Sequence, residues 1–319
     1  MSRFDVTAVG ETMLRLSVPS GERLEAAASL DMVVGGAESN VLAALSRLDR
    51  SCGYCTALPD NPLGRRVANA LRETGINLQM VQWKPRGRVG LYFIEFAEPP
   101  RSIQVIYDRA DSCAAALALD SAALAELCDT RLLHVTGITP GVSVELRELT
   151  RQAFHKARQQ GTAISFDVNY RSRLWPVDEA ASTLQEFANG VDILFCKEAD
   201  ARLIFGCDGS SYEIILDLAK KTGALTVVMT VGALGVYALQ SGQVLYQPAM
   251  PVIMVDRIGA GDALAAGVLH GWLDGDLLRG MQYGTAMAAL VMGQFGDMLR
   301  TNAAEVEHIL SAPQPHIQR

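Results

Sequence analysis

The sequence is poor in the features that mark several large classes of protein. Its 319 residues include 28 lysines and arginines against 35 acidic residues, a formal net charge of −7, and contain no run of basic residues. A nucleic-acid-binding surface needs a basic stripe, so the composition disfavours that class. A membrane-spanning apolar run and a signal-peptide pattern are also missing, so we expect a cytoplasmic protein that does not contact membranes.

Cysteine and histidine are scarce and show no spacing typical of a site. Six cysteines in a chain of this length do not form a disulfide framework, and the five histidines are scattered. Cys52 and Cys55 make a CxxC pair, but the apolar segment 51–57 around them is typical of a buried strand. A redox or metal site would need a helix N-terminus or a second Cys/His pair. We therefore interpret both as small buried side chains of a reduced protein.

Two common nucleotide-binding motifs are also absent. The chain has no Walker A sequence, and Gly10-Glu11-Thr12 after the first candidate strand does not fit the G-x-G-x-x-G pattern of dinucleotide-binding folds. This disfavours a P-loop enzyme and a dinucleotide-dependent dehydrogenase.

The sequence does contain a regular alternation of strand-length apolar runs with helical patterns. Strands are expected at 6–10, 51–57, 132–136, 163–168, 191–195 and 226–230, and the first helices at 39–48 and 64–75. Such alternation predicts an α/β fold, with a mostly parallel sheet flanked by helices on both faces. We expect a single domain over residues 1–319.

Two regions near the N-terminus depart from this pattern. Segments 13–34 and 87–109 lack helical crossovers, and apolar side chains alternate at Val89, Leu91 and Phe93 in the second of them. This is typical of half-exposed antiparallel strands. We expect a small β-sheet lid that excludes water from a site on the core, the alternative being an edge hairpin of the main sheet.

A small-residue turn near the C-terminus, Gly259-Ala260-Gly261-Asp262, leads into an apolar segment of helical length. Glycines permit close approach of a ligand, and the free N–H groups of a helix start make an anion site. Asp262 is expected to be ionised there, as a base beside a phosphate-sized charge. That pairing suggests phosphoryl transfer to a hydroxyl, whereas the alternative is a plain loop with Asp262 as the helix cap.

A second glycine pair, Gly35-Gly36, precedes the helix expected from residue 39. Asn40 in its first turn could bond a sugar hydroxyl. The alternative is an ordinary turn capped by Ser39 or Asn40.

Together these motifs resemble the two signatures of the ribokinase (PfkB-type) family of sugar kinases. The first is the Gly-Gly-x-x-x-Asn pattern that ends at Asn40, with Asp-x-x-x-Gly from Asp60, and the second is the run 256–262. The resemblance spans nearly the whole chain and implies a ribokinase-like α/β fold with a β-sheet lid. It implies Asp262 as the catalytic base and the amides of 259–261 (Gly259, Ala260 and Gly261) as stabilisers of the phosphoryl group. It also implies ATP and Mg²⁺ as cofactors and leaves a monovalent cation open.

Within that family the chain is most similar to 2-keto-3-deoxygluconate kinases, through segments 10–16, 90–92, 107–110 and 167–175. The resemblance implies a set of substrate-binding residues: Gly36, Asn40, Tyr92, Tyr107, Arg109 and Arg171. Tyr107 and Arg109 are two apart on an expected strand and so share a face. The planar arginine fork suits a carboxylate, so Arg109 and Arg171 are both expected to hold the carboxylate of an acid sugar. The alternative for Arg171 is a surface salt bridge.

On the nucleotide side, the resemblance implies that Thr230, Gly232, Gly235 and the late acidic residue Asp297 contact ATP. One position departs from many relatives, which carry Asn-x-x-Glu after the strand ending near 195. Here Lys197 replaces the Asn and Asp200 the Glu. Lys197 could touch phosphate directly. Asp200 is only a weak metal candidate, so the metal ligands stay unknown. Arg257 stands where many relatives have Thr.

We therefore expect ATP-dependent phosphorylation of a hydroxyl on a small sugar acid, 2-keto-3-deoxygluconate, by a homo-oligomer formed through the lid. The alternatives are another family kinase, such as a fructokinase or ribokinase, and a non-catalytic sugar or nucleotide sensor. The intact Asp262 run disfavours the sensor.

Overall fold

A nine-stranded sheet forms the centre of the computed structural model, which describes residues 2–19, 21–97 and 100–311. Its strand order is β13-β12-β11-β10-β9-β8-β1-β4-β5. The strands are β1 (Phe4–Val9), β4 (Cys52–Pro59), β5 (Val81–Lys84), β8 (Thr130–Thr136), β9 (Ala163–Asp167), β10 (Ile193–Lys197), β11 (Thr226–Thr230), β12 (Gly235–Gln240) and β13 (Gln243–Pro248). All neighbours pair in parallel except β11–β12 and β12–β13, which are antiparallel.

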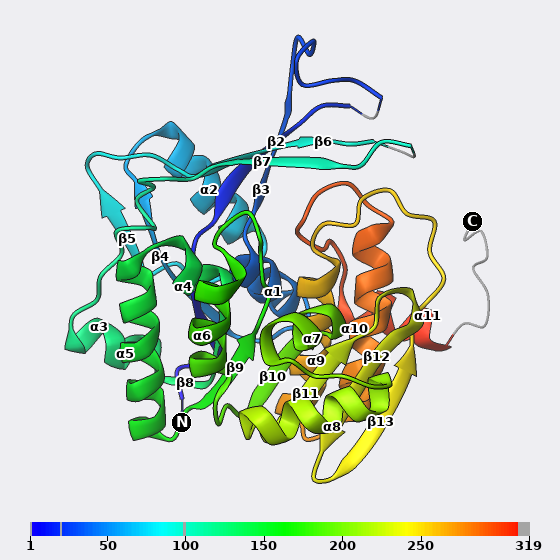
Figure 1. Cartoon of the computed structure of the whole chain (residues 1–319). Coiled ribbons are helices and arrows are strands. Elements are labelled where there is room, and N and C mark those ends of the chain that lie inside the picture. The colour runs from blue at the N-terminus through cyan, green and yellow to red at the C-terminus, as the bar shows by residue number, and fades with distance from the viewer. Residues whose placement is uncertain (1, 20, 98–99, 312–319) are drawn as a thin grey trace.

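Helices cover both faces of this sheet (Figure 1). One face carries α1 (Ala37–Ser46), α2 (Pro62–Glu73), α9 (Ala260–Leu273), α10 (Leu277–Met292) and α11 (Ala303–Ser311). The other carries α3 (Ser121–Leu127), α4 (Ile138–Val142), α5 (Val144–Gln160), α6 (Val177–Ala188), α7 (Glu198–Phe205) and α8 (Ser211–Thr222), and a short 3₁₀ turn, η1 (Gly232–Leu234), follows β11. Among the described residues, no helix is both long and apolar enough to cross a membrane.

The strands read as continuous apolar runs because both of their faces are buried. Leu132 and Leu133 of β8 are both fully buried, yet Leu132 packs in the core cluster of one face and Leu133 in that of the other. Successive strand side chains point to opposite faces, and each buried Leu contributes about 1.5–3 kcal/mol. The predicted mostly parallel sheet is confirmed, and the antiparallel β12–β13 hairpin at its edge was not predicted.

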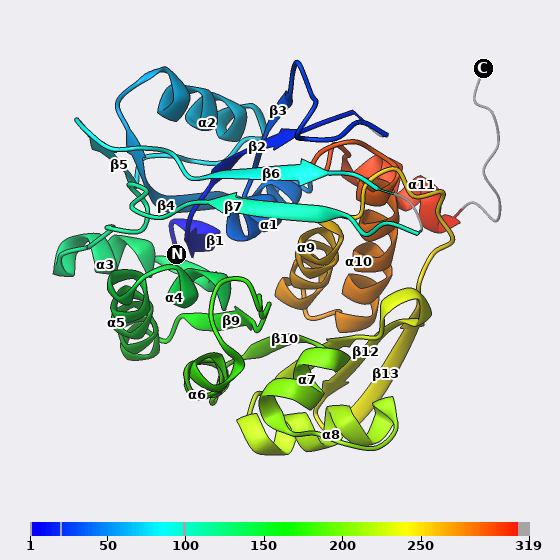
Figure 2. The same cartoon turned by 45° about the horizontal axis from the view of Figure 1, so that its top comes forward.

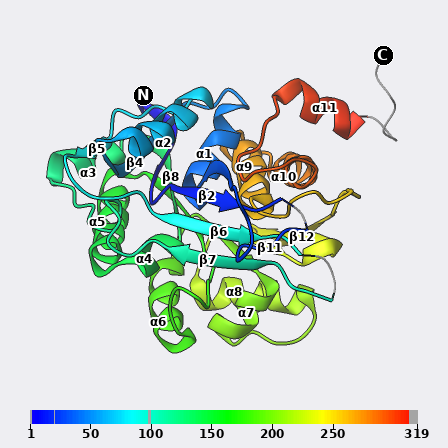
Figure 3. The ribbon, with the colours of Figure 1, turned by 90° about the horizontal axis from the view of Figure 1, so that it is seen from above.

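A separate four-stranded sheet lies above the carboxyl ends of the core strands (Figures 2 and 3). Its order is β3-β2-β6-β7, with β2 (Met13–Ser17), β3 (Asp31–Gly35), β6 (Leu91–Glu95) and β7 (Gln104–Asp108). This second sheet, the lid, excludes the alternative of an edge hairpin. The expected antiparallel pairing was wrong at its centre, because β2 and β6 pair in parallel. Each of them is the first strand of its own antiparallel pair, and the two pairs join through those first strands.

Candidate active site

A cavity of about 1340 Å³ lies between the lid and the carboxyl edge of the core sheet. Three core strands end at it, β9 at Asp167, β10 at Lys197 and β11 at Thr230, and Lys197 and Thr230 are register partners. This edge is where open α/β sheets bind ligands. All the expected site residues line the cavity except Asp200: Gly36, Asn40, Tyr92, Tyr107, Arg109, Arg171, Lys197, Thr230, Gly232, Gly235, Gly259, Ala260, Gly261, Asp262 and Asp297.

The expected anion site is the start of α9. Gly259 adopts a φ of 86°, and a Cβ there would clash with the backbone oxygen of Asp297. At Gly261 a Cβ would meet nothing within 4 Å, so the space above this residue is open to a ligand. The first N–H groups of a helix have no partner within the helix. The turn therefore offers donors to an anion without a side chain in the way.

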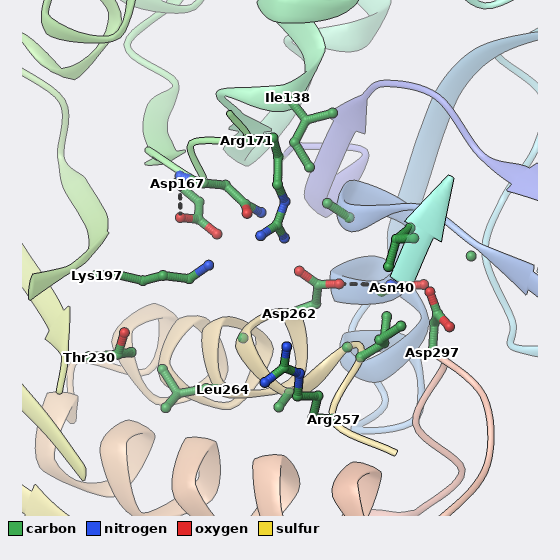
Figure 4. A pocket seen from close by; sticks show the side chains of 18 of the residues that line it. Asn40, Ile138, Asp167, Arg171, Lys197, Thr230, Arg257, Asp262, Leu264 and Asp297 are labelled. Atoms are coloured by element: carbon green, nitrogen blue, oxygen red, sulfur yellow. Dashed lines mark hydrogen bonds between the residues drawn. The ribbon is translucent and has the colours of Figure 1, made fainter. Parts of the chain in front are cut away.

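Asp262 lies at the centre of the cavity (Figure 4) and does not cap its helix. Its Oδ2 accepts a hydrogen bond from Nδ2 of Asn40 at 2.7 Å. Burial raises the pKa of Asp262 to about 6, although Asn40 and Arg171 act in the opposite direction. The helix start does not keep this pKa at its ordinary value, because burial raises it, but the expected ionised state is retained at neutral pH. At pH 7 the group is still mostly a carboxylate, near the ideal pKa of a general base.

Asn40 is held by the first turn of α1. Its Oδ1 accepts from the backbone N–H of Gly36 at 3.3 Å. Below it, Oε1 of the buried Glu38 accepts from the hydroxyls of Thr136, at 2.8 Å, and Thr139, at 2.6 Å. This fixed turn makes Asn40 a positioned donor to Asp262, and its expected contact with the sugar remains a prediction.

The sheet-edge side of the cavity, formed by the ends of β9, β10 and β11, has unpaired positive charge. In the described part of the chain, the side chains of Arg171 and Lys197 have no ion pair or hydrogen bond, and both point into the cavity (Figure 4). Asp167 lies between them. Burial raises its pKa to about 7, Lys197 lowers it, and the charge of Asp262 raises it further.

Asp200 is buried in the first turn of α7 and does not line the cavity. Burial raises its pKa, and its Oδ2 has no hydrogen-bond partner. Among the described residues, no group of three or more His, Cys, Asp or Glu could hold a metal ion.

On the lid side the charges are already paired. Arg109 Nη2 lies 2.5 Å from Glu11 Oε2, and its Nε donates to the same oxygen at 2.8 Å. The expected strand position of Arg109 was wrong by one residue, because β7 ends at Asp108. Its guanidinium nevertheless lies 5.7 Å from the centre of the Tyr107 ring, which stacks on Tyr92 at 6.0 Å.

Asp297 does not lie beside Lys197 and Thr230. It is on the opposite side of Asp262, where its Oδ2 accepts from the hydroxyl of Tyr92 (Figure 4). This placement puts Asp297 with the lid-side residues, and its expected contact with ATP is not supported by its position.

Sequence reasoning assigned no role to several residues of the site, chief among them Glu11, Arg15, Asp167 and Asp256. Glu11 and Asp167 follow or end strands of the parallel sheet, so their position was a usable signal. The sequence around Arg15 contained no such signal, because a polar residue on a lid strand is expected to face solvent.

Comparison with known proteins agrees with this geometry. The model of the pfkB family of carbohydrate kinases matches residues 3–304. The chain belongs to that family. It is a sugar kinase with the ribokinase-like fold that the signatures predicted.

Its curated relatives include kinases named for acid sugars. A 2-dehydro-3-deoxygalactonokinase of Haloferax volcanii is 39% identical over 316 residues, 99% of each chain. A 2-dehydro-3-deoxygluconokinase of Bacillus subtilis is 30% identical, covering 93% of this chain and 92% of that one.

Solved structures show the same architecture. The 2-dehydro-3-deoxygluconokinase of Thermotoga maritima has a TM-score of 0.89 at 31% identity, covering 96% of this chain and 98% of its own. An Escherichia coli structure in complex with ATP and Mg²⁺ has a TM-score of 0.86 at 20% identity, covering 96% and 99%, which is a likeness of fold alone.

Proposed function

We propose that this protein transfers the γ-phosphoryl group of ATP to a hydroxyl of a 2-keto-3-deoxy sugar acid, with 2-keto-3-deoxygluconate as the first candidate. The observation that carries the proposal is Asp262, a base of pKa about 6 beside an open helix start, with the unpaired Arg171 facing it. Relatives named for the gluconate and galactonate forms support the substrate class, and they make the galactonate form the second candidate.

In the proposed reaction Asp262 takes the proton of the attacking hydroxyl as the O–P bond forms and the bond to ADP breaks. The amides of 259–261 hold the charge of the transferring phosphoryl group. Lys197 and Thr230, at neighbouring strand ends, are placed for the nucleotide phosphates. Arg171 holds the substrate carboxylate through its planar fork.

Mg²⁺ fits this donor set as an ion held mainly by phosphate oxygens and water. It seldom uses a cage of protein ligands alone and commonly takes one or two carboxylates with substrate phosphates. Asp167, at the end of β9, is a carboxylate of the sheet-edge side that lines the cavity. When bound there, the ion would neutralise phosphate charge, and we propose Asp167 as its protein ligand.

The test is an ADP-release assay with 2-keto-3-deoxygluconate, 2-keto-3-deoxygalactonate, fructose and ribose. We expect kcat/KM for the acid sugars to exceed that for the neutral ones by about 10²-fold, the worth of a bidentate charge-assisted contact. Preference for a neutral sugar would reject the acid substrate and leave a fructokinase or ribokinase. Binding without turnover of any sugar would favour the sensor.

We also propose that the protein forms a homo-oligomer through the lid. The lid exposes apolar side chains at its two outer strands, 36% of Met32 on β3 and 49% of Ile106 on β7. Light scattering should show an oligomer that Ile106→Lys dissociates. A monomeric wild type contradicts this proposal.

A further inference from the structure

Arg15 is a completely buried cation on the lid strand β2. Its side chain has no exposed surface and is not part of the cavity wall, so it does not contact a ligand there. A buried charge is costly unless carboxylates and hydrogen bonds compensate it. Arg15 has two carboxylates: Nη2 lies 2.6 Å from Asp256 Oδ2, and Nη1 lies 2.5 Å from Asp297 Oδ1. The arginine therefore joins two segments of the core to the lid.

The first of these segments leads directly into the catalytic turn. Asp256 Oδ1 accepts from the backbone N–H of Ile258 at 3.0 Å, the residue before Gly259. Its Oδ2 accepts from the N–H of Gly296 at 3.3 Å. One carboxylate thus fixes the entry to the anion site and also takes the charge of Arg15.

The second segment reaches the lid tyrosines. Asp297 Oδ2 accepts from the hydroxyl of Tyr92, whose ring stacks on Tyr107 in the cavity wall. The backbone oxygen of Asp297 packs so closely on Gly259 that only glycine fits there. The contacts run without a break from Tyr92 through Asp297, Arg15 and Asp256 to the turn that holds the phosphoryl group.

The Arg15 guanidinium is also packed on one side by aromatic rings. Its central carbon lies 5.1 Å from the ring centre of Phe96 on the lid side and 5.0 Å from that of Phe295. Cation–π contacts of this kind add to the attraction that holds the cation in place. Because Arg15 is on the lid strand β2, a shift of the lid relative to the core would change its distances to both carboxylates.

We propose that Arg15 is a positioning residue that couples occupation of the sugar site to the geometry of the phosphoryl-binding turn. Sugar held by Tyr92 and Tyr107 fixes Asp297, and Arg15 transmits this order to Asp256 and the start of α9. The proposal rests on the kinase function proposed above. It does not depend on which sugar the enzyme phosphorylates.

The coupling is measured as the dissociation constant of Mg²⁺·AMP-PNP, by calorimetry, with and without saturating sugar. The probe is 2-keto-3-deoxygluconate, or whichever sugar the wild type turns over fastest. We expect the sugar to tighten nucleotide binding by about 5–150-fold in the wild type, the usual range of coupling between two sites. Arg15→Lys keeps the charge but cannot bridge both carboxylates. It should reduce the ratio to about twofold or less, while nucleotide binding without sugar changes by less than about threefold.

Arg101→Lys is the matched control. Arg101 is another lid arginine, and it pairs with Glu95 at 2.9 Å without contacting the catalytic turn. If Arg15 only stabilises the lid, Arg15→Lys lowers the melting temperature but keeps the wild-type ratio, as Arg101→Lys should, and this result overturns the proposal. A wild-type ratio near one also overturns it.

If Arg15→Lys does not fold, Tyr92→Phe tests the same link, because it removes the bond to Asp297 and leaves the buried charge compensated. In Tyr92→Phe the ratio of the nucleotide dissociation constants without and with sugar should also approach one. A ratio as large as that of the wild type overturns the proposal. Failure of the proposed function is distinct, because it shows as absence of turnover in the wild type.

Discussion

The lid side and the sheet-edge side of the cavity, which lie on opposite sides of Asp262, differ in how their charged side chains are paired. On the lid side Arg109 is paired with Glu11, and Arg15 has two carboxylates within 2.6 Å. On the sheet-edge side Arg171 and Lys197 form no ion pair or side-chain hydrogen bond among the described residues, although both act on Asp167 through their charge. Paired charges make a frame that is complete before a ligand arrives. Unpaired cations at a cavity wall leave their electrostatic attraction for an incoming anion.

This difference matches the two kinds of ligand group. A charge that is buried and unpaired destabilises the fold. The unpaired cations Arg171 and Lys197 therefore line the cavity, where water or ligand can reach them, whereas the paired Arg15 lies outside the cavity wall. The lid side suits ligand hydroxyls, which can form hydrogen bonds with the tyrosines and carboxylates of the protein. The sheet-edge side suits phosphates and a substrate carboxylate, in a protein whose overall charge of −7 would otherwise repel them.

The largest effect is expected at the residue between the two sides. Asp262→Asn keeps the size of the side chain and removes the proton acceptor, so kcat should fall by about 10²–10⁴-fold. Sugar and nucleotide dissociation constants, measured by calorimetry, should change little, because the charges on both sides remain. Near-wild-type turnover in steady-state assays would mean that Asp262 is not the base.

Replacing one arginine on each side tests which side binds the substrate carboxylate. Arg171→Ala should lower kcat/KM for the acid sugar by about 10–150-fold, the loss of a charge-assisted contact worth about 1.5–3 kcal/mol. A neutral sugar should be affected far less. Arg109→Ala should lower kcat/KM for both substrates to a similar extent, because Arg109 already forms an ion pair with Glu11.

The measurement is kcat/KM for an acid and a neutral sugar in both variants. Arg171→Lys serves as the control and should recover only part of the activity, since lysine keeps the charge without the planar fork. If Arg109→Ala alone removes the preference for the acid, the substrate carboxylate binds on the lid side and not at Arg171.

The pH profile tests the environment of the base. Asp262 must lose its proton to act, and its raised pKa of about 6 means that kcat/KM falls as pH drops through that value, to about one tenth of the plateau at pH 5. Asn40 donates to the carboxylate and lowers its pKa, so Asn40→Ala should move this limb to higher pH. Asp167→Asn controls for the second carboxyl: the limb should remain and move to lower pH, because the two carboxylates repel each other. An unchanged limb in Asn40→Ala would show that the limb belongs to another group.

The sequence was informative where position in the fold dictates chemistry. The turn at 259–262, the strand end at Thr230 and the lid segments lie where the patterns predicted, whereas β10 ends at Lys197, two residues beyond the expected strand 191–195. Each of them is local: a glycine turn before a helix, a polar residue after a buried strand, or an alternation of apolar side chains.

Pairing between distant segments could not be read in this way. Arg109 finds Glu11, and Arg15 finds Asp256 and Asp297, only after the lid has folded over the core. The pKa of Asp262 depends on burial that local sequence does not encode. For the same reason Asp297 was expected with the nucleotide, although the fold carries its side chain to Tyr92.

The smallest effect concerns stability on the sheet-edge side. The folded-state pKa of Asp167, about 7, exceeds the ordinary value, so its ionisation opposes folding as pH rises from about 4 through 7. Asp167→Asn removes that cost. The variant should gain about 1–2 kcal/mol more stability at pH 8 than at pH 5, a few degrees in melting temperature for a chain of this size.

Asp5→Asn is the control of opposite sign. The pKa of Asp5 is lowered, with bonds from Ser51 and Arg131 outweighing burial, so its carboxylate stabilises the fold above its pKa and the variant should melt lower at pH 8. Calorimetric melting at both pH values checks both variants. If Asp167→Asn gains nothing at pH 8, the cations of the sheet-edge side already compensate Asp167. Asp167 would then be a compensated charge, like Arg109 and Arg15 on the lid side, although it lies on the sheet-edge side.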